Sequence, residues 1–86
     1  MSRVHIVSNA GALIACLPMV EDGDVVLLIE DGVYATANPA LLNVDVVALD
    51  VDVDARGVEL PAHIATSNYA GFVSLVVAHD ASVSWS

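Results

Sequence analysis

The run Val25–Ile29 is apolar at every position, so neither face of this segment suits water. A strand that is buried on both faces is typical of the middle of a parallel sheet with helices on both sides. Two other β-branched runs, Arg3–Val7 and Val44–Leu49, alternate with segments of helical character. Such alternation indicates parallel strands joined by right-handed crossovers. The sequence therefore predicts an α/β fold: a small three-layer α/β/α domain with a four- to five-stranded, mostly parallel sheet.

Two longer helices are predicted, each after a residue that can cap its first turn. They cover Ala10–Met19 after Ser8 or Asn9, and Tyr69–His79 after Ser67 or Asn68. The inward stripe of the second helix is expected to hold Phe72, Val73, Val76 and Val77. The shorter predicted elements are a helix at Val33–Ala37, a turn at Pro39–Leu42, a strand at Ile64–Thr66, and an edge strand or docking tail at Ser82–Trp85. A further brief helix is predicted with Asp50 as its cap and Gly57 as the residue that ends it.

A chain of 86 residues is expected to form one domain over residues 1–86. A domain of this size buries only about 60–65% of its unfolded surface and is marginal alone. Yet 57% of its residues are hydrophobic, more than so small a core requires. We therefore expect an oligomer with an apolar interface. The alternative is an Ala- and Val-rich core with no special surface.

The formal charge of −9 limits the partners of this chain, because the only cations besides histidine are Arg3 and Arg56. Nucleic-acid affinity comes mostly from cationic contacts with phosphates, so direct binding to nucleic acid is not expected. The lack of lysine excludes a P-loop, a pyridoxal-phosphate Schiff base and a Ser-x-x-Lys site. No apolar run approaches the roughly 20 residues of a membrane span, so no membrane role is expected either.

Metal binding is not predicted, although Asp50, Asp52 and Asp54 imitate the start of a calcium-binding EF-hand loop. The glycine and the bidentate glutamate that such a loop requires are replaced by Ala55 and Pro61. The acids are better interpreted as the first turns of a short helix. The three histidines have no metal-ligand spacing, and a structural role is favoured for each: His5, His63 and His79.

Cys16 is the single cysteine, so it has no internal disulfide partner, which fits a reducing cytoplasm. It follows the middle of a predicted helix, and Glu21, Asp22 and Asp24 come soon after it. Neither the helix position nor nearby acids would lower a thiol pKa. A buried, inert cysteine is the default interpretation, and a persulfide-accepting nucleophile is the alternative.

The segment Glu30-Asp31-Gly32 follows the central strand directly. Ligands and partners of open α/β sheets gather at the carboxyl ends of strands. We therefore expect this turn, with Asp31 as its capping residue, to lie at a binding edge of the sheet.

Several short motifs occur in a fixed order: Glu21-Asp22-Gly23-Asp24 before the central strand, Glu30-Asp31-Gly32-Val33-Tyr34-Ala35 after it, Ala48-Leu49, Ala55-Arg56-Gly57, and a tail of Tyr69, Phe72-Val73, Leu75, Val77, His79 and Trp85. In this order and spacing the chain resembles the DsrH/TusB family, the small subunits of the DsrEFH and TusBCD sulfur-relay complexes. The resemblance covers the chain from the region of Cys16 to Trp85. The chain departs from the family in lacking lysine and in having Val51 and Val53 where an Asp-Leu pair is common.

The resemblance implies a DsrEFH-like fold, no cofactor and a cytoplasmic hetero-oligomer. The sibling subunits would be of the DsrE/TusD and DsrF/TusC types, and the DsrE/TusD-like sibling would carry the principal persulfide. Sulfane sulfur from a TusA-type carrier would pass to a TusE/DsrC-like acceptor, without direct contact between this chain and nucleic acid. The implied interface residues are Asp31, Gly32, Tyr34, Arg56, His79 and Trp85.

Three functions follow as hypotheses. The leading one is an accessory subunit of a sulfurtransferase complex for 2-thiolation of tRNA wobble uridine, rather than an enzyme alone. The second is a DsrH-type subunit in dissimilatory sulfur oxidation, with Cys16 as a persulfide site. The third is a stand-alone homo-oligomeric α/β binding domain. The sequence leaves the choice among them open.

Overall fold

A computed structural model describes residues 2–86, which form a five-stranded sheet in the order β4-β3-β2-β1-β5 with every pairing parallel. The strands are β1 (Arg3–Val7), β2 (Val25–Leu28), β3 (Asp45–Leu49), β4 (Ala65–Ser67) and β5 (Ala81–Trp85). The helices are α1 (Ala10–Cys16), α2 (Asp50–Arg56) and α3 (Tyr69–Ala78), with 3-10 helices η1 (Leu17–Met19), η2 (Glu30–Ala37) and η3 (Pro39–Asn43). The predicted α/β fold with a parallel sheet is confirmed.

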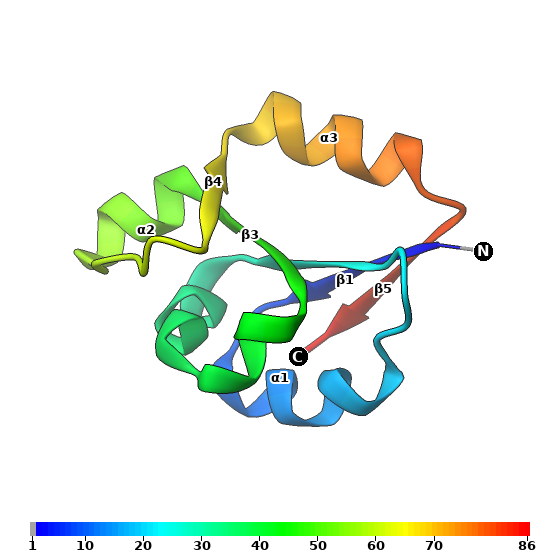
Figure 1. The fold of residues 1–86 in the computed structure, drawn as a ribbon. Coiled ribbons are helices and arrows are strands. Elements are labelled where there is room, and N and C mark those ends of the chain that lie inside the picture. Colours follow the sequence, from blue (N-terminus) through cyan, green and yellow to red (C-terminus); the bar gives the residue numbers. More distant parts are fainter. Residues whose placement is uncertain (1) are drawn as a thin grey trace.

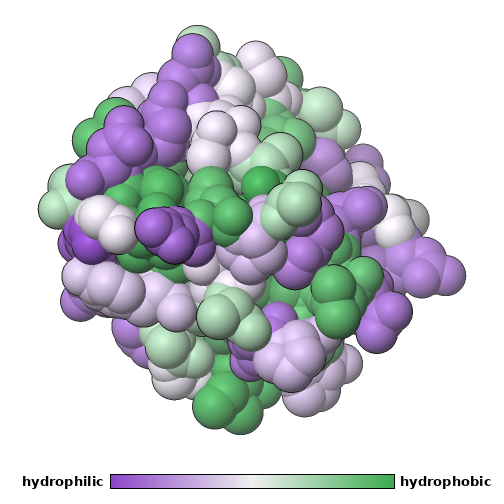
Figure 2. Space-filling view, turned by 60° about the vertical axis from the view of Figure 1, so that its left-hand side comes forward, coloured by the Kyte–Doolittle hydropathy of each residue, from purple (hydrophilic) through white to green (hydrophobic). Residues whose placement is uncertain are grey.

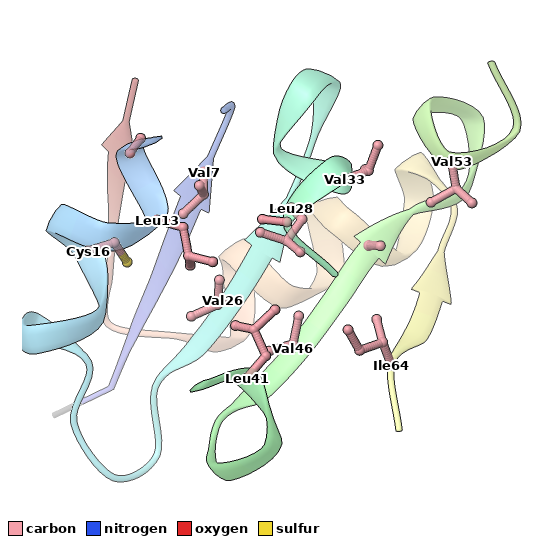
Figure 3. Close-up of a cluster of buried hydrophobic side chains, with 13 residues drawn as sticks. Val7, Leu13, Cys16, Val26, Leu28, Val33, Leu41, Val46, Val53 and Ile64 are labelled. Atoms are coloured by element: carbon pink, nitrogen blue, oxygen red, sulfur yellow. The ribbon is translucent and has the colours of Figure 1, made fainter. Parts of the chain in front are cut away.

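Helices lie on both faces of the sheet, as Figure 1 shows: α1 and the 3-10 helices below it, and α3 alone above it. Strand β2 is buried at all four positions, as the apolar run predicted. Its Val26 and Leu28 belong to the core on the α1 side, which Figure 3 shows, whereas Val25 and Leu27 pack on the α3 side. Alternate side chains of one strand thus supply both cores.

Strand β1 is the point where the strand order changes direction, because β2, β3 and β4 lie on one side of it and β5 lies on the other. It pairs with both β2 and β5. Strands β1 to β4 follow one another outward, and α3 then carries the chain back to the other side of β1. The predicted segment Ser82–Trp85 is therefore an edge strand, with Trp85 opposite Val7. Among residues 2–86, no helix is both long and apolar enough to cross a lipid bilayer.

Local capping signals predicted several element boundaries correctly. The Asn9 side chain accepts a hydrogen bond from the Ala12 amide at 2.8 Å, and Asn68 accepts one from the Gly71 amide at 2.8 Å. Gly57 ends α2 in the left-handed conformation, with φ of 62°. Asp50, however, does not cap α2: Leu49 is the N-cap residue, and the buried Oδ1 of Asp50 has no hydrogen-bond partner.

Two predicted helices differ from the structure in extent. The first ends at Cys16 and continues as the 3-10 turn η1, because Pro18 has no amide proton to donate to the helix. The helix predicted at Val33–Ala37 begins at Glu30 instead and is a 3-10 helix, η2, to Ala37. Asp31 therefore lies inside η2 and does not cap it as predicted, because the N-cap residue is Ile29.

The predicted inward stripe of α3 is wrong at two positions. Phe72 and Leu75 pack against the sheet, but Val73 is 57% exposed and Val77 78% exposed. Because α3 is apolar on every side, its hydrophobic pattern does not mark which face turns inward.

Candidate functional site

The turn after β2 lies at the carboxyl edge of the sheet and is fastened to the neighbouring strand β1. The Ile29 amide donates to the Val7 carbonyl at 3.0 Å, and the Gly32 amide donates to the Ile29 carbonyl at 2.8 Å. Between them, Glu30 adopts a φ of 49°, in the left-handed region that a side chain disfavours by about 1–2 kcal/mol. The backbone of this turn is therefore held in place by its contacts rather than by local preference.

Gly32 is required by a close approach of two backbones. A Cβ atom at this position would overlap the carbonyl oxygen of Val7, and backbone atoms cannot swing aside as a flexible side chain can. The presence of glycine allows η2 to begin directly against the end of β1. Gly32 is buried, so it shapes the turn and offers no side chain to a partner.

Arg56 joins helix α2 to this turn. Its Nε donates to Asp31 Oδ1 at 2.9 Å, and a terminal nitrogen donates to Asp52 Oδ1 at 3.3 Å. The other carboxylate oxygen of Asp52 accepts the Glu30 amide at 2.8 Å. We call Glu30, Asp31, Asp52 and Arg56 the edge cluster. It brings together two segments that are 22 to 25 positions apart in the sequence.

The electrostatics of the edge cluster are set by the pairing of Arg56 with two carboxylates. The hydrogen bond to Asp31, with the charges of Asp31 and Asp52, raises the pKa of Arg56, so this guanidinium stays charged. The side chain of Asp31 is 67% exposed and Tyr34 nearby in η2 is 57% exposed. The cluster contains a fixed cation and exposed acids, with no nucleophile beside a base. Figure 2, which turns the α2 end forward, shows apolar patches interrupted by polar side chains.

Cys16 lies in the core on the α1 side and is completely buried (Figure 3). Burial raises the pKa of its thiol to about 11, an effect that Arg3 opposes and Asp24 reinforces. The thiol is therefore protonated and inaccessible in this structure. The edge cluster lies at the other end of α1, because α1 starts at the carboxyl edge of β1 and ends with Cys16.

Two of the expected interface residues lie apart from the edge cluster. His79 follows the end of α3 before β5, at the amino edge of the sheet, and its Nδ1 donates to the Leu75 carbonyl at 2.7 Å. Trp85 is partly buried and directs its indole at His5. The structure thus brings Asp31, Gly32, Tyr34 and Arg56 into one region and leaves His79 and Trp85 outside it.

Sequence reasoning missed a buried polar network at the amino edge. His5 Nε2 lies 2.9 Å from Asp24 Oδ2, and both side chains are fully buried. Asp24 also accepts the amides of Arg3 at 2.8 Å and Glu21 at 3.1 Å. Burial alone would raise the pKa of Asp24, but these hydrogen bonds and the charge of Arg3 outweigh it and lower the pKa to about 2. The only sequence signal was a histidine in a strand next to otherwise apolar positions.

A cavity of about 390 Å³ opens beside this network, between η1, the loop before β2 and the end of η3. Its lining includes apolar side chains such as Leu17 and Leu42, together with four acids: Glu21, Asp22, Asp24 and Asp45. It lies at the edge opposite to the edge cluster. Within residues 2–86, His, Cys, Asp and Glu side chains do not gather in threes in a way that could hold a metal ion.

The family model and the curated relatives that match this chain agree on one family. A family model described as "DsrH like protein" matches residues 7–82. Protein TusB of Enterobacter sp. (strain 638) is 38% identical over 78 residues, covering 80% of this chain and 82% of that protein. Protein TusB of Cronobacter sakazakii (strain ATCC BAA-894) is 37% identical over 84 residues, covering 83% and 84%. The crystal structure of the ychN protein from E. coli matches with a TM-score of 0.74 over 98% of this chain and 99% of that one. Its sequence identity is 16%, so this last likeness concerns the fold alone.

Proposed function

The chain belongs to the DsrH family, and from this we propose that it is an accessory, non-catalytic subunit of a cytoplasmic sulfur-relay complex that serves 2-thiolation of tRNA wobble uridine. The observation that carries the accessory role is the state of Cys16. Persulfide transfer requires an accessible thiolate, and the one cysteine of this chain is buried and protonated. The transferred sulfur is therefore carried by cysteines of other subunits.

The curated relatives favour the tRNA branch over the sulfur-oxidation branch, since both are named TusB. The match to this chain covers more than four-fifths of the length of each of them. The formal charge of −9 supports an indirect role, because the chain has no basic surface with which to hold tRNA. In the proposed complex, DsrE/TusD-like and DsrF/TusC-like siblings flank this subunit, and a TusE/DsrC-like protein accepts the sulfur.

We assign the contact with a sibling subunit to the edge cluster and Tyr34. Arg56 is held by two carboxylates, so its guanidinium plane is fixed before a partner arrives. Tyrosine and arginine are enriched among residues that dominate binding energy at interfaces. The exposed Asp31 gives a partner cation a place to bind.

The test is performed in the native cell. Deleting the gene should abolish 2-thiouridine in bulk tRNA, as measured by mass spectrometry of nucleosides, and the wild-type gene should restore it. The Cys16→Ala variant should restore it fully, because the thiol takes no part in transfer. Restoration by wild type but not by Cys16→Ala would contradict the accessory role and establish Cys16 as a relay cysteine. Unchanged 2-thiouridine after deletion would contradict the tRNA branch.

The sibling contact has its own matched pair of variants. Asp31→Asn removes one negative charge and so the ion pair with Arg56, while an amide oxygen can still accept the Arg56 hydrogen bond. Asp22→Asn removes one negative charge at the opposite edge. A tagged chain with Asp31→Asn should capture siblings at least about fivefold less well than wild type, a loss of about 1 kcal/mol. Asp22→Asn should capture them normally. Equal capture by the two variants would remove the edge cluster from the interface.

A further inference from the structure

Helix α3 presents an apolar face to solvent. Tyr69, Val73 and Val77 are spaced four residues apart, so they form one stripe along the helix, and they are 62%, 57% and 78% exposed. The opposite face, with Phe72 and Leu75, already packs on the sheet. A helix that is apolar all round is normally buried on all sides. Figure 1 shows α3 alone on its face of the sheet, so no other helix of residues 2–86 covers this stripe.

Charged side chains are absent along the whole helix. None of the eleven acids of the chain lies within Tyr69–Ala78, and Asp80 follows two positions after its end. The strong negative charge of the molecule is thus located elsewhere, and like-charge repulsion does not prevent two copies from meeting at α3.

A second stripe of small residues lies beside the first. Ala70, Ser74 and Ala78 are also spaced four apart, and all three are exposed. The outer face of α3 therefore has a bulky row and a small row side by side. Small residues allow two helices to approach closely, and large side chains opposite small ones fill the space between them.

We propose that this face binds the same face of a second copy of the chain, with the two α3 helices antiparallel. A two-fold axis between Val73 and Ser74 sets each bulky residue opposite a small one of the second copy. Tyr69 meets Ala78, Val77 meets Ala70, and Val73 meets Ser74. The outer face of α3 is in this sense self-complementary, as an isologous two-fold interface requires.

Charge complementarity favours the same arrangement. The antiparallel pair brings Asp80 of one copy to the first turn of α3 in the other, where the helix dipole is positive. Asp80 is exposed, and its Oδ2 accepts the Ser2 amide at 2.8 Å. A parallel pair would instead bring the two Asp80 carboxylates together.

This inference goes beyond the sulfur-relay role and does not depend on it. The contact concerns two copies of one chain, whether or not sibling subunits are bound elsewhere. It lies on the α3 face of the sheet, whereas the edge cluster lies at the carboxyl edge around η2 and α2.

Cysteine cross-linking in the native cell tests the contact. Ser74 is next to the proposed axis, so Ser74→Cys should form a disulfide between two copies when cells are treated with a thiol oxidant. The product should have twice the chain mass of 8.9 kDa on a non-reducing gel. Wild type, whose one cysteine is buried, and Ala40→Cys, an exposed position in η3, should remain at the single-chain mass.

A second variant measures the oligomer without cross-linking. Val73→Asp places two acids across the axis and should at least halve the mass of the purified oligomer in light scattering, with an unchanged circular dichroism spectrum. No disulfide from Ser74→Cys together with an unchanged mass for Val73→Asp would overturn the proposal. A Ser74→Cys product with a chain of another mass would overturn it too, by identifying a different occupant. Neither outcome affects the 2-thiouridine measurement that tests the relay role.

Discussion

The indole Nε1 of Trp85 donates a hydrogen bond to Nδ1 of His5 at 3.1 Å, although the two residues are 80 positions apart in the chain. Because Nδ1 accepts this bond, the imidazole proton lies on Nε2, which donates to Asp24 at 2.9 Å. One neutral histidine thus connects the last strand β5 to β1 and to the residue before β2. The edge strand is fastened through this ring in addition to its ladder of backbone bonds.

Trp85→Phe should lower the free energy of unfolding by roughly 1–3 kcal/mol, because it leaves the buried Nδ1 of His5 without a donor. The measurement is urea unfolding followed by circular dichroism. Tyr69→Phe is the control, since it removes a hydroxyl from a 62% exposed ring and should change stability by less than about 0.5 kcal/mol. If the two variants lose the same stability, the indole hydrogen bond contributes nothing.

Stability should depend on acid pH through Asp24. Burial raises the pKa of this carboxyl, but its hydrogen bonds and the charge of Arg3 lower it by more, so the pKa falls from 3.8 to about 2 on folding. The resulting stabilisation, about 2 kcal/mol, is present above pH 4 and is lost as pH falls toward 2. Asp24→Asn should therefore be less stable than wild type at pH 6, and the difference should shrink by pH 2. Asp22→Asn, at an exposed position, should show no such convergence.

Gly32→Ala should cost about 3 kcal/mol, since the added methyl group meets the backbone carbonyl of Val7. Two other glycines give a matched series under thermal unfolding. Gly57→Ala has open space but a φ of 62°, and should cost about 1 kcal/mol. Gly11→Ala lies in α1, where alanine is the better helix former, and should stabilise by about 0.5–1 kcal/mol. A Gly32→Ala cost no greater than that of Gly57→Ala would show that the turn moves aside.

The sequence predicted features whose causes are local. Asn9 and Gly57 mark helix ends because a capping side chain and a left-handed backbone act within a few residues. The alternation of strands and helices predicted a parallel sheet in the same way. The Glu30-Asp31-Gly32 turn was correctly placed at the end of a strand. Its hydrogen bond with Arg56 was not predicted, because the two segments are distant in the sequence and meet only in the folded chain.

The features that escaped prediction depend on distant contacts. Nothing close to Asp24 in the sequence indicated that it is buried against His5, which is 19 positions away. The sequence likewise did not indicate that the indole of Trp85 donates to the same histidine. The outward position of Val73 and Val77 was hidden because α3 has no polar side to identify its solvent face. Hydrophobic periodicity is informative only where the two faces differ.

The burial of Cys16 gives a direct chemical prediction. With a thiol pKa of about 11, only about 0.1% of the molecules hold a thiolate at pH 8, and the side chain has no exposed surface. Iodoacetamide should therefore modify the folded chain at least about 100-fold more slowly than the chain in urea, followed by intact-mass spectrometry. Asp24→Asn should hardly change the native rate, since burial rather than the neighbouring carboxylate is the main cause of the raised pKa. Rapid alkylation of the folded protein would mean that the core opens around Cys16, and it would restore the hypothesis that this residue accepts persulfide sulfur.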